Sequence, residues 1–109
     1  IKVSTDIKIL GLIAGPIPYN YLNGHLAIEY QLSQNANVDI RIYSIAGEKI
    51  KTWNFDSGSQ GALQGFNKLT WNGKTTNNTY ISNGPYVIYM TASNNSGTAT
   101  SKSKIVVLR

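Results

Sequence analysis

The stretch LAIEYQLSQNANVDIRIYSIAGEKIKTWNF, residues 26–55, decides the fold. Its first half holds two runs in which apolar and polar residues alternate. The apolar members of these runs are Leu26, Ile28, Tyr30 and Leu32, followed by Val38, Ile40 and Ile42. Strict alternation is the pattern of a β-strand with one buried face. The second run turns at Ala46-Gly47 into a third run over residues 49–55, so we expect residues 38–55 to form a hairpin.

Short segments of the same kind lie on both sides of this stretch, separated by Gly and Asn clusters. The expected strands are residues 7–13, 25–33, 38–43, 49–55, 67–71 and 86–92, and a last strand that ends in KIVVLR at residues 104–109. Residues 56–65, DSGSQGALQG, have no periodicity and are expected to form a loop. The sequence therefore predicts an all-β fold, a seven-stranded antiparallel β-sandwich of the immunoglobulin or fibronectin III type.

Length and composition favour one domain. The chain has 109 residues, of which 41% are hydrophobic and 14% charged, and about 100 residues is the usual size of such a sandwich. We expect a single domain over residues 1–109. Residues 1–25 would supply a first strand and a crossing stretch, in which Pro16 and Pro18 prevent regular pairing and the chain switches between sheets.

Four stretches in this order resemble the FlgD-type Ig-like family, whose domains occur in the flagellar hook-capping protein and in many secreted bacterial proteins. They are residues 26–50, GFNKLTWNGK at 65–74, NGPYVIYMTAS at 83–93 and the terminal KIVVLR. The resemblance covers residues 26–109. Two positions depart from the family pattern: Asn72 stands where Asp is usual, and Asn78-Thr79 replaces a turn that commonly holds Gly. Asn72 can still cap its turn by hydrogen bonding to the backbone.

Several residues in the matching stretches have expected structural roles. Trp71 alternates in step with Leu69 and is expected in the core, followed by a turn at Asn72 and Gly73. Gly84 opens the next strand. Tyr86 lies in step with Ile88 and Met90 and is expected in the core, and its hydroxyl is expected to bond nearby backbone as in a tyrosine corner.

Catalytic and metal-binding patterns are missing from the sequence. It has one histidine, His25, and no cysteine, so zinc ligands and thiol chemistry are not available. The acidic residues are Asp6, Glu29, Asp39, Glu48 and Asp56. Glu29 and Asp39 lie on outward faces of strands that could be neighbours, although ordinary surface ion pairs explain them more simply. We expect no enzyme activity, no cofactor and no metal. A calcium site that uses Asn54, Asp56, Ser57 and Ser59 is the alternative left open.

Charge and aromatic residues bear on the kind of partner. The net charge is +5, but the basic residues are spread along the chain, so nucleic-acid binding is not expected. No apolar run reaches the roughly 18 residues of a membrane span. The candidate exposed aromatics are Tyr19, Tyr21, Tyr43, Trp53, Tyr80 and Tyr89. Trp53 has the opposite parity from Ile50, so either a bulge turns it inward or it is exposed. If Trp53 and Tyr43 share one exposed face, they would form a platform for a polysaccharide or protein partner.

The leading interpretation is a non-catalytic structural or attachment module of a bacterial extracellular or surface protein. It would act as a spacer, sorting or docking domain beside a protein partner, neighbouring domain or subunit, or assemble fibres through its sheet edges. One hypothesis is that residues 1–13 pair with a neighbouring copy and build a homo-polymer. The apolar residues of this strand-exchange segment are Ile7, Ile9, Leu10, Leu12 and Ile13. The alternatives are a carbohydrate-binding module and a flagellar hook-capping domain, which would usually bring further flanking segments.

Overall fold

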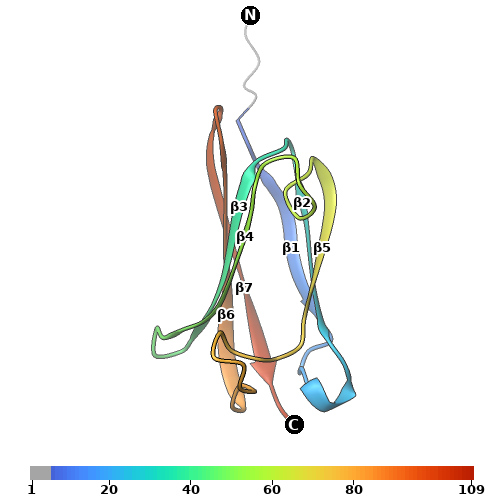
Figure 1. Cartoon of the computed structure of the whole chain (residues 1–109), viewed down its shortest axis with the longest axis vertical. Coiled ribbons are helices and arrows are strands. Elements are labelled where there is room, and N and C mark those ends of the chain that lie inside the picture. The colour runs from blue at the N-terminus through green and yellow to red at the C-terminus, as the bar shows by residue number, and fades with distance from the viewer. Residues whose placement is uncertain (1–5) are drawn as a thin grey trace, which may run out of the picture.

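The computed structural model describes residues 6–109 as a sandwich of two sheets (Figure 1). The strands are β1 (Ile9–Gly15), β2 (Leu26–Leu32), β3 (Asn37–Ser44), β4 (Lys49–Phe55), β5 (Gly65–Trp71), β6 (Gly84–Asn94) and β7 (Gly97–Val107). A single 3-10 turn, η1 (Tyr21–Asn23), is the helical element of this part of the chain. Within the described residues, no helix is long and apolar enough to cross a membrane. These elements confirm the predicted seven-stranded all-β fold.

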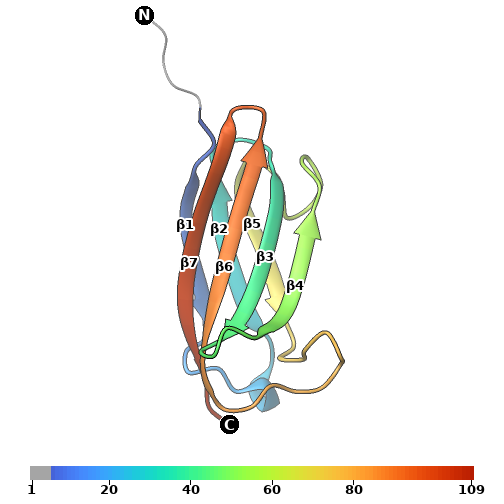
Figure 2. The same cartoon turned by 90° about the vertical axis from the view of Figure 1, so that its left-hand side faces the viewer.

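Both sheets are antiparallel, as predicted. One sheet has three strands in the order β1-β2-β5, and the other has four in the order β4-β3-β6-β7. Figure 2 shows the four-stranded sheet in front of the three-stranded one. The predicted hairpin of residues 38–55 is the β3–β4 pair, whose turn contains Gly47 at φ 87°. The β6–β7 hairpin is longer than predicted and pairs from Gly84–Val107 to Asn94–Gly97.

The core lies between the sheets and is built from the inward positions of each strand. Ile28 of β2, Ile40 and Ile42 of β3, and Ile88 and Met90 of β6 are fully buried. They face each other because successive residues of a strand point to opposite faces, so alternation delivers a whole apolar side to the interior. Trp71 is also buried, at 2% exposed, in the position expected for it.

After the first strand, the chain crosses from the three-stranded sheet to the edge of the four-stranded sheet. β1 pairs with β2 in the three-stranded sheet, and the chain then crosses at residues 16–18. Tyr19 forms a parallel bridge with Val107 of the other sheet, since its N–H donates to the Val106 carbonyl at 2.7 Å. Its own carbonyl accepts from the N–H of Leu108 at 2.9 Å. This crossing covers the final residues of edge strand β7.

The turn after Trp71 holds together through its asparagine. The Asn72 side-chain oxygen accepts from the Lys74 N–H at 3.0 Å, and the Trp71 ring nitrogen donates to the Lys74 carbonyl at 2.8 Å. Gly73 between them has φ +81°, and a Cβ there would lie 2.9 Å from the Cβ of Tyr21. Asparagine therefore serves this turn without the carboxylate that is usual in the family.

Asn78 explains the second departure from the family pattern. It is the non-glycine residue with positive φ, 66°, in the described chain. Asn tolerates the left-handed region better than other residues that carry a side chain. Asn78 thus takes the conformation that glycine would otherwise supply.

The predicted loop at residues 56–65 is tied to the body of the sandwich. Ala62 is completely buried, and its carbonyl accepts from the N–H groups of Ala36 and Gly58. The Tyr30 hydroxyl donates to the Gly61 carbonyl at 2.8 Å. Asn67, which is 4% exposed, bonds Leu63 and Gly65 through its side chain. The loop is a series of turns that closes one end of the core.

Candidate docking surfaces

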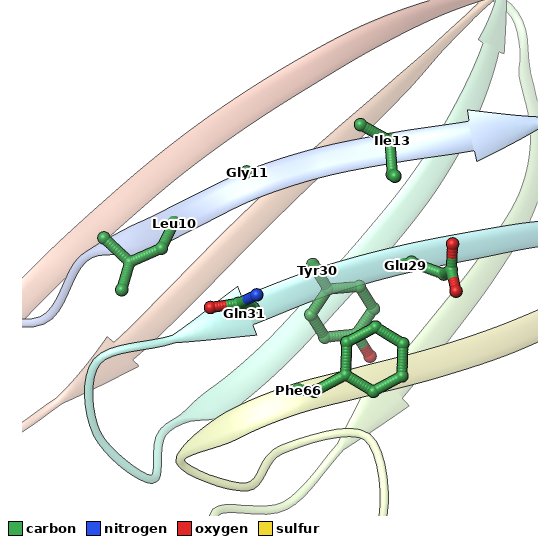
Figure 3. Close-up of a pocket in the computed structure, with 7 residues that line it drawn as sticks. All are labelled: Leu10, Gly11, Ile13, Glu29, Tyr30, Gln31 and Phe66. Carbon is green, nitrogen blue, oxygen red and sulfur yellow. The ribbon is translucent and has the colours of Figure 1, made fainter.

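An exposed apolar group occupies the outer face of the three-stranded sheet. Leu10, Ile13 and Phe66 are 53%, 63% and 60% exposed, and they surround a shallow hollow over Gly11. Figure 3 shows Leu10 and Ile13 on β1 on either side of Gly11, with Phe66 across on β5. A Cβ at Gly11 would meet nothing within 4 Å, so the floor of the hollow is open.

A β-bulge in β1 creates this arrangement. The pairing passes from Ile9–Leu32 to Leu12–Tyr30, so β1 uses one more residue than β2. Gly11 supplies the left-handed φ of +95° that the extra residue needs. As a result Ile9 and Leu12 both face the core while Leu10 points outward. Strand β1 (Ile9–Gly15) starts and ends two residues later than the predicted strand of residues 7–13.

The proposed strand-exchange segment lies in its own sheet. Ile7 and Leu12 are buried in the core, Ile9 packs against it, and β1 pairs with β2 up to Gly15. Residues 1–5 of the segment lie outside the described residues. Exchange of this strand between copies therefore stays a prediction, and the structure describes the strand in the unexchanged position.

Trp53 and Tyr43 do not share a face. Trp53 pairs with buried Ile40 and packs edge-on against Trp71, with 6.2 Å between the ring centroids. Tyr43 lies on the outer face of β3, one residue after buried Ile42. The condition for a joint platform is therefore not met.

A bulge in β4 accounts for the inward position of Trp53. The register shifts between Ile42 and Tyr43, which pair with Lys51 and Lys49, so Ile50 is the extra residue. Both Ile50 and Trp53 consequently pack against the core. Of the two interpretations of Trp53, the inward one is correct.

The two carboxylates considered as a pair are on opposite sides of the molecule. Glu29 lies on the outer face of the three-stranded sheet, opposite Lys68, whereas Asp39 lies on the outer face of the four-stranded sheet. The possibility that β2 and β3 are neighbours is ruled out, because β2 lies in the three-stranded sheet and β3 in the four-stranded sheet. A two-carboxylate hydrolytic site is therefore not assembled from Glu29 and Asp39.

The other candidate ligand groups lie apart or are already engaged. Asn54 and Asp56 line the same shallow depression, but the Ser59 hydroxyl is bonded to the Asp56 carbonyl at 2.5 Å. His25 borders a separate depression beside Trp53. Within residues 6–109, no group of three His, Cys, Asp or Glu side chains is placed to hold a metal ion.

Buried tyrosines have structural hydrogen bonds. Burial raises the pKa of Tyr30 to about 12 and also raises that of Tyr86. The Tyr86 hydroxyl donates to the Ser82 carbonyl at 2.8 Å, the nearby backbone contact of a tyrosine corner. Tyr19 donates to the carbonyls of Gly24 and Trp71. These phenols stay protonated near neutral pH and act as donors within the fold.

Sequence reasoning did not find Phe66 or the aromatic stack at the end of the sandwich. Tyr21 and Tyr80 are stacked with centroids 4.1 Å apart, between the cations of Arg109 and Lys74. The position of Phe66 was available from alternation, because Asn67, Leu69 and Trp71 point inward. The Tyr21–Tyr80 stack had no local signal, since its two rings come from distant turns.

One protein-family model matches most of the chain, and solved structures share its fold. A family model described as the FlgD Ig-like domain matches residues 21–96. FlgD from P. aeruginosa has a solved structure with a TM-score of 0.61 and 16% identity, covering 95% of this chain and 70% of that one. For FlgD from Xanthomonas campestris the values are 0.49 and 16%, covering 93% of this chain and 64% of that one. No curated protein sequence gives a significant match.

Proposed function

The chain belongs to the FlgD Ig-like domain family, and from this we propose that it is a non-catalytic assembly module of a flagellar hook-capping protein. Its role would be to make contacts between protein subunits while the hook is built outside the cell. This was an alternative in the sequence analysis, and it is preferred to a general surface spacer because it is the more specific role within the family. The match to residues 21–96 carries the proposal, since it includes all of β2 to β6.

The apolar hollow supports a protein partner. Leu10, Ile13 and Phe66 form an exposed apolar group on a rigid sheet, and exposed apolar patches on small domains are common interaction sites. The open space over Gly11 suits one apolar side chain of a neighbouring subunit. Glu29 also lines the hollow and would give the contact a polar group.

Polysaccharide binding through Tyr43 and Trp53 is not proposed, because the two rings lie on opposite sides of the four-stranded sheet. Sugar-binding platforms need ring faces that are free on one surface. Here Trp53 is turned toward Trp71.

A genetic test addresses the proposed function directly. The gene that encodes this chain is deleted in its source bacterium, and hook-basal bodies are purified and viewed by electron microscopy. We expect basal bodies without hooks, restored by the wild-type gene. The variant Phe66→Ser should restore hooks less well, because it removes the apolar rim of the hollow. Gln31→Ser, an exposed polar change at the same hollow, is the matched control. Hooks of normal number and length in the deletion strain would contradict the proposal.

A further inference from the structure

The outer face of the four-stranded sheet has a different chemistry from the hollow on the opposite side. The cross-strand pairing aligns two neighbouring outward rows: Lys49, Tyr43, Val87 and Lys104 in one, and Thr52, Arg41, Tyr89 and Lys102 in the other. Each row thus runs across all four strands. The lysines are at the outer strands, and the apolar and aromatic side chains with Arg41 are in the middle.

Positive charge dominates this face. The carboxylate beside Arg41 is Asp39, which already accepts two hydrogen bonds from it, at 2.8 and 3.1 Å, and Glu48 precedes Lys49 in the chain. Lys49, Lys102 and Lys104 are exposed and make no ion pair with any residue of the described chain. On the other sheet the outward Lys68 faces Glu29 across the strands. One side of the sandwich is therefore basic, while the other carries balanced charges and the apolar hollow.

Arg41 holds the centre of the face in a defined arrangement. It donates to the Tyr43 hydroxyl at 3.4 Å and is ion-paired to Asp39, and the hydrogen bonds to Tyr43 and to Asp39 raise its pKa. The Arg41 side chain is 42% exposed. The face has arginine and tyrosine in its centre and lysine at its margin. This composition is typical of a protein interface, in which the central residues supply most of the affinity and the marginal ones supply charge complementarity to the partner.

We propose that this basic face, defined as Arg41, Tyr43, Lys49, Val87, Tyr89, Lys102 and Lys104, binds an acidic surface of a second protein. The proposal rests on the proposed function and deepens it: the domain would bridge two neighbours, one at the hollow and an acidic one on the opposite side. Charge complementarity is the argument for this partner, since unpaired lysines attract carboxylates and speed association.

The breadth of the face suits a protein partner. Four strands about 4.8 Å apart give a surface about 14 Å across, with a depression between Val87, Lys102 and Lys104. Tyr43 is half-buried and Tyr89 is 36% exposed, so the face offers one exposed ring and not a platform of two rings for a sugar to stack on. A surface of this size suits a transient contact at the small end of known interfaces.

A titration of the ¹⁵N-labelled chain with poly-L-glutamate, followed by NMR, tests the face. We expect saturable shifts confined to the backbone amides of the outward-facing residues of β3, β4, β6 and β7. These shifts should be lost in 0.5 M NaCl, because salt screens exposed charges. The double variant Lys102→Gln/Lys104→Gln should weaken binding at least fivefold. Lys8→Gln/Lys68→Gln removes the same charge from exposed positions elsewhere and should change the Kd less than twofold. All four lysines are exposed, and a dispersed spectrum verifies that each variant is folded.

Two results would overturn the proposal. If both double variants bound poly-L-glutamate equally weakly, the binding would depend only on the net charge of the chain. Tenfold tighter binding of heparin at the same face would identify a sulfated polysaccharide as the better ligand. The genetic test is independent of this titration: normal hooks in the deletion strain with selective binding at the basic face would reject the hook function alone. Missing hooks with equal weakening in both variants would reject the basic face alone.

Discussion

Replacing Tyr30 with phenylalanine tests how the buried hydroxyl of β2 holds the 56–65 loop. Tyr30 is 2% exposed, and its hydroxyl donates to the buried Gly61 carbonyl at 2.8 Å. Tyr30→Phe keeps the ring but leaves this carbonyl without its donor. A buried acceptor that loses its partner costs about 1–2 kcal/mol. We therefore expect the free energy of unfolding at pH 8 to fall by that amount.

The pH dependence makes this prediction specific to the hydroxyl. Burial raises the pKa of Tyr30 to about 12, whereas an unfolded tyrosine titrates near 10. Between these values the unfolded chain releases the proton and the folded one keeps it, so the folded state loses stability as the pH rises through this window. One pH unit corresponds to about 1.4 kcal/mol. Phenylalanine has no such loss, so the gap between wild type and Tyr30→Phe should shrink by about 1 kcal/mol between pH 9.5 and 11.

Urea unfolding followed by tryptophan fluorescence at pH 8, 9.5 and 11 measures this gap. The other tyrosines and the lysines titrate in both proteins and largely cancel in the difference. Tyr86→Phe is a control, because its hydroxyl also bonds a backbone carbonyl but at a partly buried site. A gap for Tyr30→Phe that stays constant from pH 8 to 11 would refute the reasoning, since it would mean that the hydroxyl titrates alike in both states.

Three further substitutions test local features, each by urea unfolding at pH 7. Thr52→Val should raise the free energy of unfolding by about 1 kcal/mol, because the buried Thr52 hydroxyl has no hydrogen-bond partner among residues 6–109; a loss of stability would contradict this. Gly73→Ala should cost at least about 2 kcal/mol, since the new Cβ lies 2.9 Å from Tyr21 at a φ of +81°, and an unchanged midpoint would show that the turn adapts. Asn78→Ala should cost about 1 kcal/mol at its φ of 66°, while Asn78→Gly should not; equal effects of the two would argue against the backbone as the cause.

Part of the site follows from local pattern. Alternation in residues 26–32 and 38–42 predicts which side of each strand is buried, and by the same rule Phe66 must face outward once Trp71 faces inward. A β-bulge breaks this rule, and the alternation pattern does not show where a strand takes the extra residue. At Gly11 and Ile50 one extra residue shifts the parity, so Leu10 becomes exposed while Trp53 turns inward. Local sequence contains the glycine that permits the first bulge, but the partner strand sets where the extra residue falls.

The sequence by itself determined the β-sandwich, the buried sides of residues 26–32 and 38–42, and the resemblance to its family, because strand alternation and turn residues act over a few positions. It did not determine every buried residue: Tyr19, expected among the exposed aromatics, is 1% exposed. Only the tertiary structure decided which outward residues meet. Tyr43 shares its face with Tyr89 and Lys104 rather than with Trp53, and Glu29 and Asp39 are separated by the whole sandwich. The physical reason is that a surface is assembled by hydrogen bonding between strands distant in the chain. Strand β3 pairs with β6, which lies more than forty residues away in the chain, and no local pattern specifies this pairing.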